Sequence, residues 1–214
     1  MTLQASGLAG GRGQRTLFSG IELAVGPGEA LQVAGRNGSG KTTLLRLLCG
    51  LLEPLAGEVR WRGERLHEQR DRLHRDLIFI GHAQGLKGEL SALENVRVSA
   101  ALAGHPCTRA QALQALAEVD LAARAHLPAQ ALSQGQRRRV VLARLAWQRS
   151  AGLLVLDEPF NALDPESLGL VGSLIGRQLA EGAALVYTTH QAQQVVAARR
   201  HTLELGPPGM REAA

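Results

Sequence analysis

Eight consecutive residues, GRNGSGKT at positions 35–42, constrain the fold of this chain more than any other feature. They satisfy the pattern G-x-x-x-x-G-K-[ST] of a phosphate-binding loop. An apolar run at residues 31–34 precedes the loop and an amphipathic stretch follows it, which is the strand–loop–helix context that such a loop needs. The sequence therefore predicts an α/β nucleotide-binding fold of the P-loop class.

The chemistry of this loop follows from its residue types. Glycine N–H groups can curl around phosphate oxygens, and the N-terminus of the following helix adds the positive end of its dipole. We expect Lys41 to contact the β- and γ-phosphates and Thr42 to bind Mg²⁺ through its hydroxyl. The alternative is a glycine-rich turn that only joins a strand to a helix. The predicted ligands of ATP are Gly35, Arg36, Asn37, Gly38, Ser39, Gly40, Lys41, Thr42 and Thr43.

The rest of the chain alternates short apolar runs with longer helical patterns. A β-rich beginning leads into an α/β core, interrupted by a largely helical region at residues 92–148. We find no internal repeat and no linker. We expect strands at 2–7, 21–25, 29–34, 57–61, 77–81, 153–156, 184–188 and 201–205, and helices at 41–52 and 165–180.

A second motif places two acidic residues after a buried strand. Residues 153–156 are a continuous apolar run, typical of a parallel strand buried on both faces, and Asp157 and Glu158 follow directly. We expect Asp157 to hold Mg²⁺ through water and Glu158 to polarise the attacking water as a catalytic base. Alone, the pattern also fits a core strand that ends in two solvated acids. After a phosphate-binding loop, it indicates a nucleotide-hydrolysing site.

A third motif, LSQGQ at residues 132–136, distinguishes among the classes of P-loop protein. It resembles the LSGGQ signature of ABC cassettes, and a basic helical stretch at 137–149 follows it. The resemblance implies that Ser133, Gly135 and Gln136 form a second anion-binding surface, which contacts ATP held by another copy of the chain. It therefore implies a homodimer with two ATP molecules at the interface. Ser133 and Gln136 also have the spacing of a helix-capping box, and the two roles are compatible.

Two later motifs extend the resemblance to ABC cassettes. NALD at residues 161–164 is similar to the D-loop, and His190 is similar to the switch histidine, which contacts the γ-phosphate as a second catalytic residue. The family implies a RecA-like parallel core with an N-terminal antiparallel β subdomain and a helical subdomain. We expect one ABC ATPase domain over 1–206, its helical subdomain at about 90–148, and a disordered tail over 207–214.

The chain departs from the usual cassette pattern at two places. The position of the glutamine that normally ligates Mg²⁺ falls on His82, and Gln84 follows shortly after it. Mg²⁺ prefers oxygen ligands, so either His82 acts through a water or Gln84 reaches the metal. Residues 10–15 also lack the aromatic side chain that usually stacks on adenine. Either Arg12 or Arg15 stacks on the base or the base is loosely held, so we expect weak selectivity between ATP and GTP.

The first departure indicates a subfamily. Residues 81–95, GHAQGLKGELSALEN, resemble the same segment of the CcmA family, the haem-exporter ATPases of cytochrome c biogenesis. The resemblance implies an ATPase subunit on the cytoplasmic face of the bacterial inner membrane, partnered by multi-span membrane subunits of the CcmB and CcmC type. In that family, hydrolysis drives release of a haem-loaded periplasmic chaperone.

Composition bears on the remaining alternatives. The net charge of +5 comes from scattered arginines, which favours compositional bias over a nucleic-acid-binding patch, and we expect no nucleic-acid partner. Two cysteines without a CxxC pattern support neither a zinc site nor a disulfide framework. The most apolar stretch, 44–52, is too short to span a bilayer, which takes about 20 residues. An ATPase of another ABC exporter or importer remains an alternative, as does an ABC ATPase that acts on nucleic acid or ribosomes.

Overall fold

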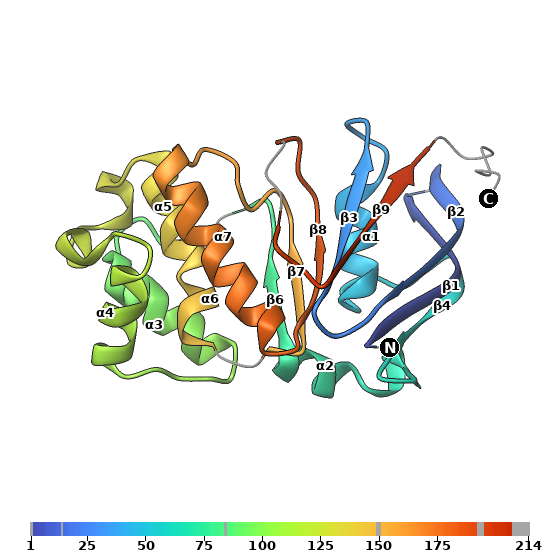
Figure 1. Cartoon of the computed structure of the whole chain (residues 1–214), viewed down its shortest axis with the longest axis horizontal. Helices are drawn as coiled ribbons and strands as arrows, with labels where there is room; N and C mark the ends of the chain where they lie inside the picture. The colour runs from blue at the N-terminus through green and yellow to red at the C-terminus, as the bar shows by residue number, and fades with distance from the viewer. Residues whose placement is uncertain (1, 14, 84, 149–150, 192–194, 207–214) are drawn as a thin grey trace.

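The computed structural model describes residues 2–13, 15–83, 85–148, 151–191 and 195–206. Gln84 and the predicted tail at 207–214 lie outside the described residues. Two sheets and a group of helices are arranged along the long axis of the molecule, with the helical part at one end and the N-terminal sheet at the other (Figure 1). No helix among the described residues has the length and apolar character needed to cross a membrane.

A parallel sheet forms the centre and has the strand order β6-β7-β8-β3-β9. All of its neighbouring strands pair in parallel, as the continuous apolar runs predicted. The carboxyl ends of parallel strands meet at one edge, which brings the loops after β3, β7 and β8 together. The strands are β3 (Glu29–Gly35), β6 (Leu77–Ile80), β7 (Leu153–Leu156), β8 (Ala184–Tyr187) and β9 (Arg199–Leu205).

A second sheet, entirely antiparallel, has the order β2-β1-β4-β5. Its first two strands are longer than predicted, because a hairpin continues the pairing through the glycine-rich stretch to Arg12 and Arg15. Glycine weakens isolated strands, and cross-strand pairing with register shifts overrides that preference here. The strands are β1 (Leu3–Arg12), β2 (Arg15–Val25), β4 (Ala56–Trp61) and β5 (Glu64–Arg65).

Helix α1 (Lys41–Leu48) follows the glycine-rich loop, as predicted, but ends earlier than residue 52. Gly50 adopts a φ of 66°, a left-handed conformation that ends helices, so the prediction was wrong beyond Leu48. A short 3₁₀ turn, η1 (Leu66–Glu68), and helix α2 (Arg70–Asp76) then lead into β6, and neither was predicted.

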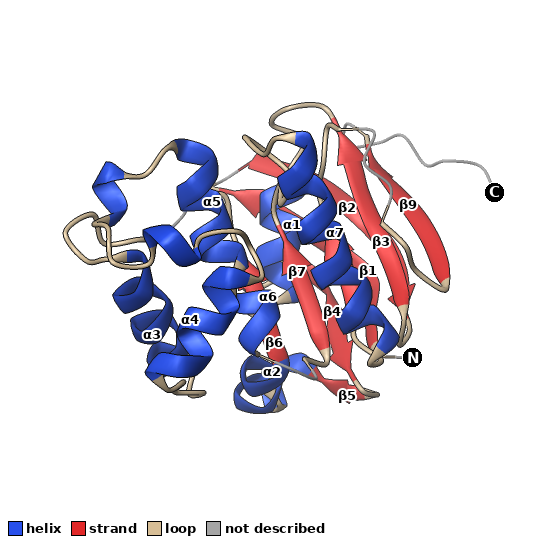
Figure 2. Cartoon of the chain, turned by 60° about the vertical axis from the view of Figure 1, so that its left-hand side comes forward, coloured by secondary structure: helices blue, strands red, loops and turns tan. Residues whose placement is uncertain are grey.

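Most other helices lie together at one end of the molecule (Figure 2). The stretch predicted as one basic helix is two consecutive helices, α5 and α6. Capping boxes begin three of the helices, with Ser91, Thr108 and Ser133 as the N-cap residues. The bounds are α3 (Ala92–Leu102), α4 (Arg109–Ala117), η2 (Ala122–Arg124), η3 (Ala129–Ala131), α5 (Gln134–Leu142), α6 (Arg144–Trp147) and α7 (Pro165–Ala180).

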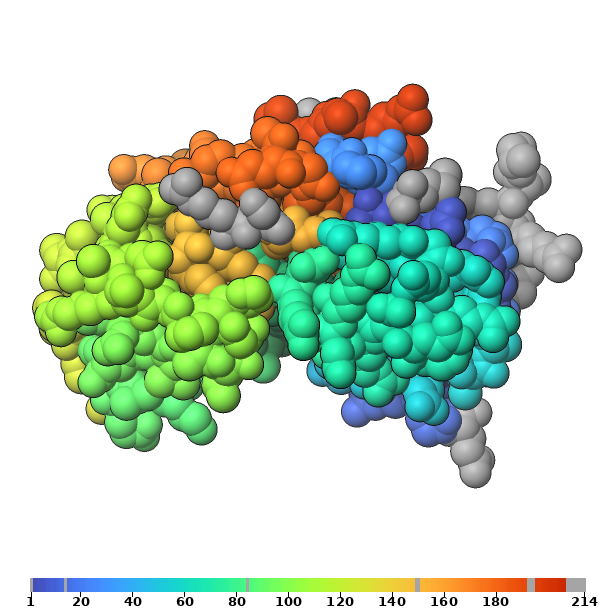
Figure 3. All heavy atoms as spheres, turned by 90° about the horizontal axis from the view of Figure 1, so that it is seen from below, coloured from blue at the N-terminus to red at the C-terminus, as the bar shows by residue number. Residues whose placement is uncertain are grey.

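The parallel sheet separates two hydrophobic cores. Alternate residues of β7 face opposite sides, so Leu154 and Leu156 pack with the helical part while Leu153 and Val155 pack with α1 and the antiparallel sheet. The surface is hollowed between the helical end and the sheets when the molecule is seen from below (Figure 3). The structure is therefore an α/β fold with a parallel core, an antiparallel β part and a helical part, as predicted.

Candidate nucleotide-binding site

A cavity of about 700 Å³ lies where the loop after β3 meets the carboxyl ends of β7 and β8. It brings together residues that are far apart in the sequence. The predicted site residues that line it are Asn37, Gly38, Gly40, Lys41, Thr42, Thr43, His82, Asp157, Glu158 and His190. Its other lining residues are Arg12, Arg15, Leu17 and Asn161.

The glycine-rich loop curls back on itself between β3 and α1. Gly35, Gly38 and Gly40 all have positive φ, and a Cβ at Gly40 would lie 2.9 Å from the Phe18 ring. The Lys41 ammonium folds over the loop and donates to the carbonyl oxygens of Gly35 at 2.7 Å and Arg36 at 3.3 Å.

Within this loop the Ser39 hydroxyl is buried and has no hydrogen-bond partner among the described residues. A buried hydroxyl without a partner is costly, and a phosphate oxygen would satisfy it. The loop therefore fits the phosphate groups of a nucleotide.

Asp157 is fixed by two threonine hydroxyls. Thr42 Oγ1 donates to its Oδ2 at 2.8 Å, and Thr188 Oγ1 donates to its Oδ1 at 2.7 Å. These hydroxyl and carboxylate oxygens are the donor types that Mg²⁺ prefers, so the residues present fit the predicted cation. Thr188 was not predicted as a site residue, although its place between β8 and His190 is a signal that could have identified it.

The two predicted catalytic residues lie side by side. His190 Nε2 is 3.4 Å from Oε1 of Glu158. The Glu158 side chain is about 10 % exposed, and neither of its carboxylate oxygens has a hydrogen-bond partner among the described residues. A buried carboxylate with unused acceptor positions at the mouth of a cavity is well suited to bind and polarise a water molecule.

Sequence reasoning missed Arg138, on α5. The residue is 4 % exposed, and its Nη2 donates to the main-chain carbonyls of Asp157 at 2.8 Å and Glu158 at 2.9 Å. Burial lowers the pKa of its guanidinium, and the charges of Asp157 and Glu158 partly oppose that shift. In the sequence it is one arginine of a basic run, and no local signal separates it from its neighbours.

The predicted signature residues do not line this cavity. Ser133 accepts a hydrogen bond from Gln136 N at 3.2 Å, and Gln136 Oε1 accepts one from Ser133 N at 3.0 Å, which confirms the capping box. A Cβ at Gly135 would lie 2.5 Å from the Ala162 carbonyl oxygen, so only glycine fits against the loop after β7. That contact between the LSQGQ and NALD segments was also not predicted.

Two cationic side chains flank the cavity on the side of the antiparallel sheet. Arg12 and Arg15 both line it, as does Leu17, and both arginines are exposed. Among the described lining residues none is phenylalanine, tyrosine or tryptophan.

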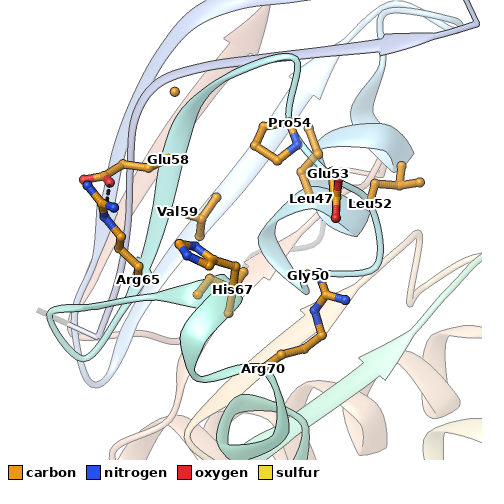
Figure 4. Close-up of a pocket in the computed structure, with 12 residues that line it drawn as sticks. Leu47, Gly50, Leu52, Glu53, Pro54, Glu58, Val59, Arg65, His67 and Arg70 are labelled. Carbon is orange, nitrogen blue, oxygen red and sulfur yellow. Dashed lines mark ion pairs between the residues drawn. The ribbon is translucent and has the colours of Figure 1, made fainter.

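A separate cavity of about 510 Å³ lies between the end of α1, β4 and η1 (Figure 4). None of the predicted site residues that the structure describes lines it, and the ion pair drawn there joins Arg65 to Glu58. The predicted chemistry is therefore concentrated in the larger cavity.

Comparisons with known proteins agree with this geometry. The sequence pattern of the ABC transporter family matches residues 18–161. The cytochrome c biogenesis ATP-binding export protein CcmA of Nitrosococcus oceani is 46% identical over 203 residues, which cover 95% of this chain and 91% of that protein.

Solved structures give the same result. The dimeric structure of MJ0796, a bacterial ABC transporter cassette, has a TM-score of 0.82 at 25% identity and covers 98% of this chain and 97% of its own. A dimeric post-hydrolysis state of MJ0796 bound to ADP and Pi has a TM-score of 0.77 at 25% identity, over 88% of each chain. The chain therefore belongs to the ATP-binding cassettes of ABC transporters, and within them to the CcmA family of cytochrome c biogenesis ATP-binding export proteins.

Proposed function

We propose that this chain is the ATPase subunit of a bacterial inner-membrane ABC complex for cytochrome c maturation, placed on the cytoplasmic face. Hydrolysis there powers release of a haem-loaded periplasmic chaperone. The observation that carries the ATPase assignment is the buried carboxylate of Glu158 beside the glycine-rich loop, which has no hydrogen-bond partner among the described residues. The similarity to CcmA proteins supports the place in haem delivery.

The residues of the site have different roles in phosphoryl transfer. Lys41 and Ser39 hold the phosphates, while Glu158 orients a water for in-line attack and His190 supports the charge on the γ-phosphate. Thr42, and Asp157 through water, would hold Mg²⁺, which would supply neutralisation of the phosphate charge. His82 faces the same cavity and would act on the cation through a water.

The site is completed by a second copy of the chain. Ser133, Gly135 and Gln136 lie at the N-terminus of α5, where the helix dipole is positive, and outside this chain's own nucleotide cavity. In a head-to-tail homodimer they contact the γ-phosphate of ATP held by the partner. The dimeric form of the MJ0796 cassette supports this arrangement.

A hollow beside the site is suited to a membrane partner. Two adjoining cavities of about 300 Å³ each lie between the loop after β6 and helices α3, α5 and α6. Apolar side chains border them, including Leu102, which is 85% exposed, and Val98. One cavity also contacts Thr42 and His82, so it connects directly to the nucleotide site. We assign it to a helix of a multi-span subunit of the CcmB or CcmC type.

We also assign residues 1–206 to one ABC ATPase domain, with a helical subdomain at about 90–148. The helices from α3 to α6 fall in that range and share one hydrophobic core with one face of the parallel sheet, which supports treating them as one unit.

Genetic complementation tests the proposal. In a bacterium that lacks its own cytochrome c biogenesis ATPase, the chain expressed with its membrane partners should restore covalent haem in c-type cytochromes, measured by haem staining. Lys41→Ala should abolish the rescue, because phosphate contacts are lost. Arg199→Ala, at a side chain 76% exposed on β9, should rescue like the parent.

Membrane proteins that co-purify in mild detergent identify the complex. Absence of rescue together with co-purification of an unrelated permease would contradict the cytochrome c assignment and favour another ABC exporter or importer.

A further inference from the structure

Arg138 connects three segments that the sequence keeps apart. It belongs to α5, the helix that begins at the LSQGQ motif, and its side chain leaves the helical part to reach the end of β7. Besides the carbonyls of Asp157 and Glu158, its Nη1 donates to the carbonyl of Gly81 at 3.3 Å, directly before His82. A single guanidinium therefore touches the backbone of both acidic residues and of the loop that carries His82.

The backbone that Arg138 holds is strained. Glu158 has a φ of 51°, a left-handed conformation that a side chain with a Cβ rarely adopts. Its N–H donates to Thr188 Oγ1 at 2.9 Å, and its carbonyl accepts from Arg138 Nη2 at 2.9 Å. The peptide groups on both sides of Glu158 are thus fixed by side chains from two other elements.

The neighbouring residue, Arg139, makes different contacts. Arg139 is also buried, at 8 % exposure, but its Nη1 donates to the carbonyls of Val119 and Asp120 and to the Asp120 carboxylate. These contacts stay within the helical part of the molecule. Of two adjacent arginines on one helix, Arg139 therefore stabilises the helical part, whereas Arg138 contacts the backbone of Glu158.

We propose that Arg138 is a positioning residue that ties the orientation of Glu158 to the position of helix α5. The inference rests on the proposed function, in which Glu158 orients the attacking water and α5 meets the partner's nucleotide. When α5 moves toward that nucleotide, Arg138 carries the movement to the Glu158 backbone. The site is then set for hydrolysis only when the dimer is closed around both nucleotides.

Steady-state kinetics of Arg138→Met and Arg139→Met test the proposal. Arg138→Met should lower kcat for ATP about tenfold or more and leave KM within about twofold, because only the orientation of water is affected. Arg139→Met should lower the urea midpoint of unfolding at least as much as Arg138→Met does. Its kcat per folded molecule should stay within about twofold of the parent value. Arg138→Lys should recover part of kcat, since one ammonium replaces part of the donor set.

A double-mutant cycle with Glu158→Gln decides whether Arg138 acts through Glu158. Under single-turnover conditions, Arg138→Met should cause no further loss in the Glu158→Gln background, whereas independent effects would add. A full further loss, or equal kcat effects of Arg138→Met and Arg139→Met, would overturn the proposal. If Arg138→Met does not fold, the same cycle with Arg138→Lys gives the answer.

The same measurements separate this proposal from the proposed function. If Glu158→Gln alone hydrolyses ATP at the parent rate, the assignment of Glu158 fails. If Glu158→Gln is inactive but its effect adds to that of Arg138→Met, only the positioning role of Arg138 fails.

Discussion

Thr42 donates a 2.8 Å hydrogen bond to the carboxylate of Asp157, although 115 residues separate the two along the chain. Thr42 lies at the start of α1 and Asp157 directly follows β7. The two predicted cation ligands are therefore already together, and the Thr42 oxygen keeps lone pairs that could bind Mg²⁺ while its hydrogen is donated to Asp157.

Thr42→Val tests this pairing, because valine keeps the shape of the side chain and removes the hydroxyl. We expect the Mg²⁺ concentration for half-maximal ATPase activity to rise about tenfold, corresponding to the loss of one oxygen ligand. ATP binding in EDTA, measured with a fluorescent analogue, should stay near the parent value. Thr43→Val is the matched control: it should weaken ATP binding without a comparable change in Mg²⁺ requirement. The same requirement in Thr42→Val and the parent would rule out Thr42 as a ligand.

Glu158→Gln should stop hydrolysis while ATP still binds, because the amide cannot accept the proton of the attacking water. We expect kcat to fall about a hundredfold or more. The variant should then accumulate as an ATP-bound dimer, detected by size-exclusion chromatography with light scattering. Adding ATP to Glu158→Gln/Lys41→Ala should give only monomer. Parent-like turnover by Glu158→Gln would show that another residue is the base.

The elements that sequence reasoning found are those whose signal is local. The glycine-rich loop and the apolar run before Asp157 each mark the carboxyl end of a strand. Parallel pairing of these strands in one sheet then brings the two strand ends together. Helix α1 was predicted to extend too far, because its apolar pattern continues past Gly50. The left-handed φ of Gly50, which ends the helix, is set by packing in the folded chain. The antiparallel strands were drawn too short because cross-strand pairing, rather than residue preference, extends them.

The site residues that were missed all act through long-range contacts. Arg138 binds carbonyls of segments that the sequence does not link to it, and Thr188 meets Asp157 only after β8 pairs with β7. Gly135 was predicted as a site residue, but its close approach to the Ala162 carbonyl, which leaves no room for a Cβ, was not. The residue types of Arg138 and Thr188 do not reveal these contacts, and only the position of Thr188 directly after β8 gave a signal in the sequence.

Ser133 carries two predicted roles that a pair of variants separates. Ser133→Ala removes the helix cap and should lower the free energy of unfolding by about 1 kcal/mol, with a lower urea midpoint. Ser133→Asp keeps a good capping side chain, so stability should be retained. The added negative charge would repel the γ-phosphate of the partner's ATP, and ATPase activity should fall about tenfold or more. Full activity of Ser133→Asp would leave Ser133 with the capping role alone.

Nucleotide selectivity tests how the base is held. Arg12 and Arg15 line the cavity from the paired ends of β1 and β2, and a guanidinium plane stacks on purines without distinguishing their edges. We therefore expect the Kd values for ATP and GTP to differ by less than about tenfold, measured by competition with a fluorescent analogue. Arg12→Ala and Arg15→Ala should weaken both nucleotides by similar factors, if the contact is to the ring face. Arg65→Ala, beside the separate cavity of Figure 4, is the control and should bind both nucleotides like the parent. A hundredfold preference for ATP would contradict this prediction, because it requires hydrogen bonds to the adenine edge, at about 1.4 kcal/mol for each tenfold.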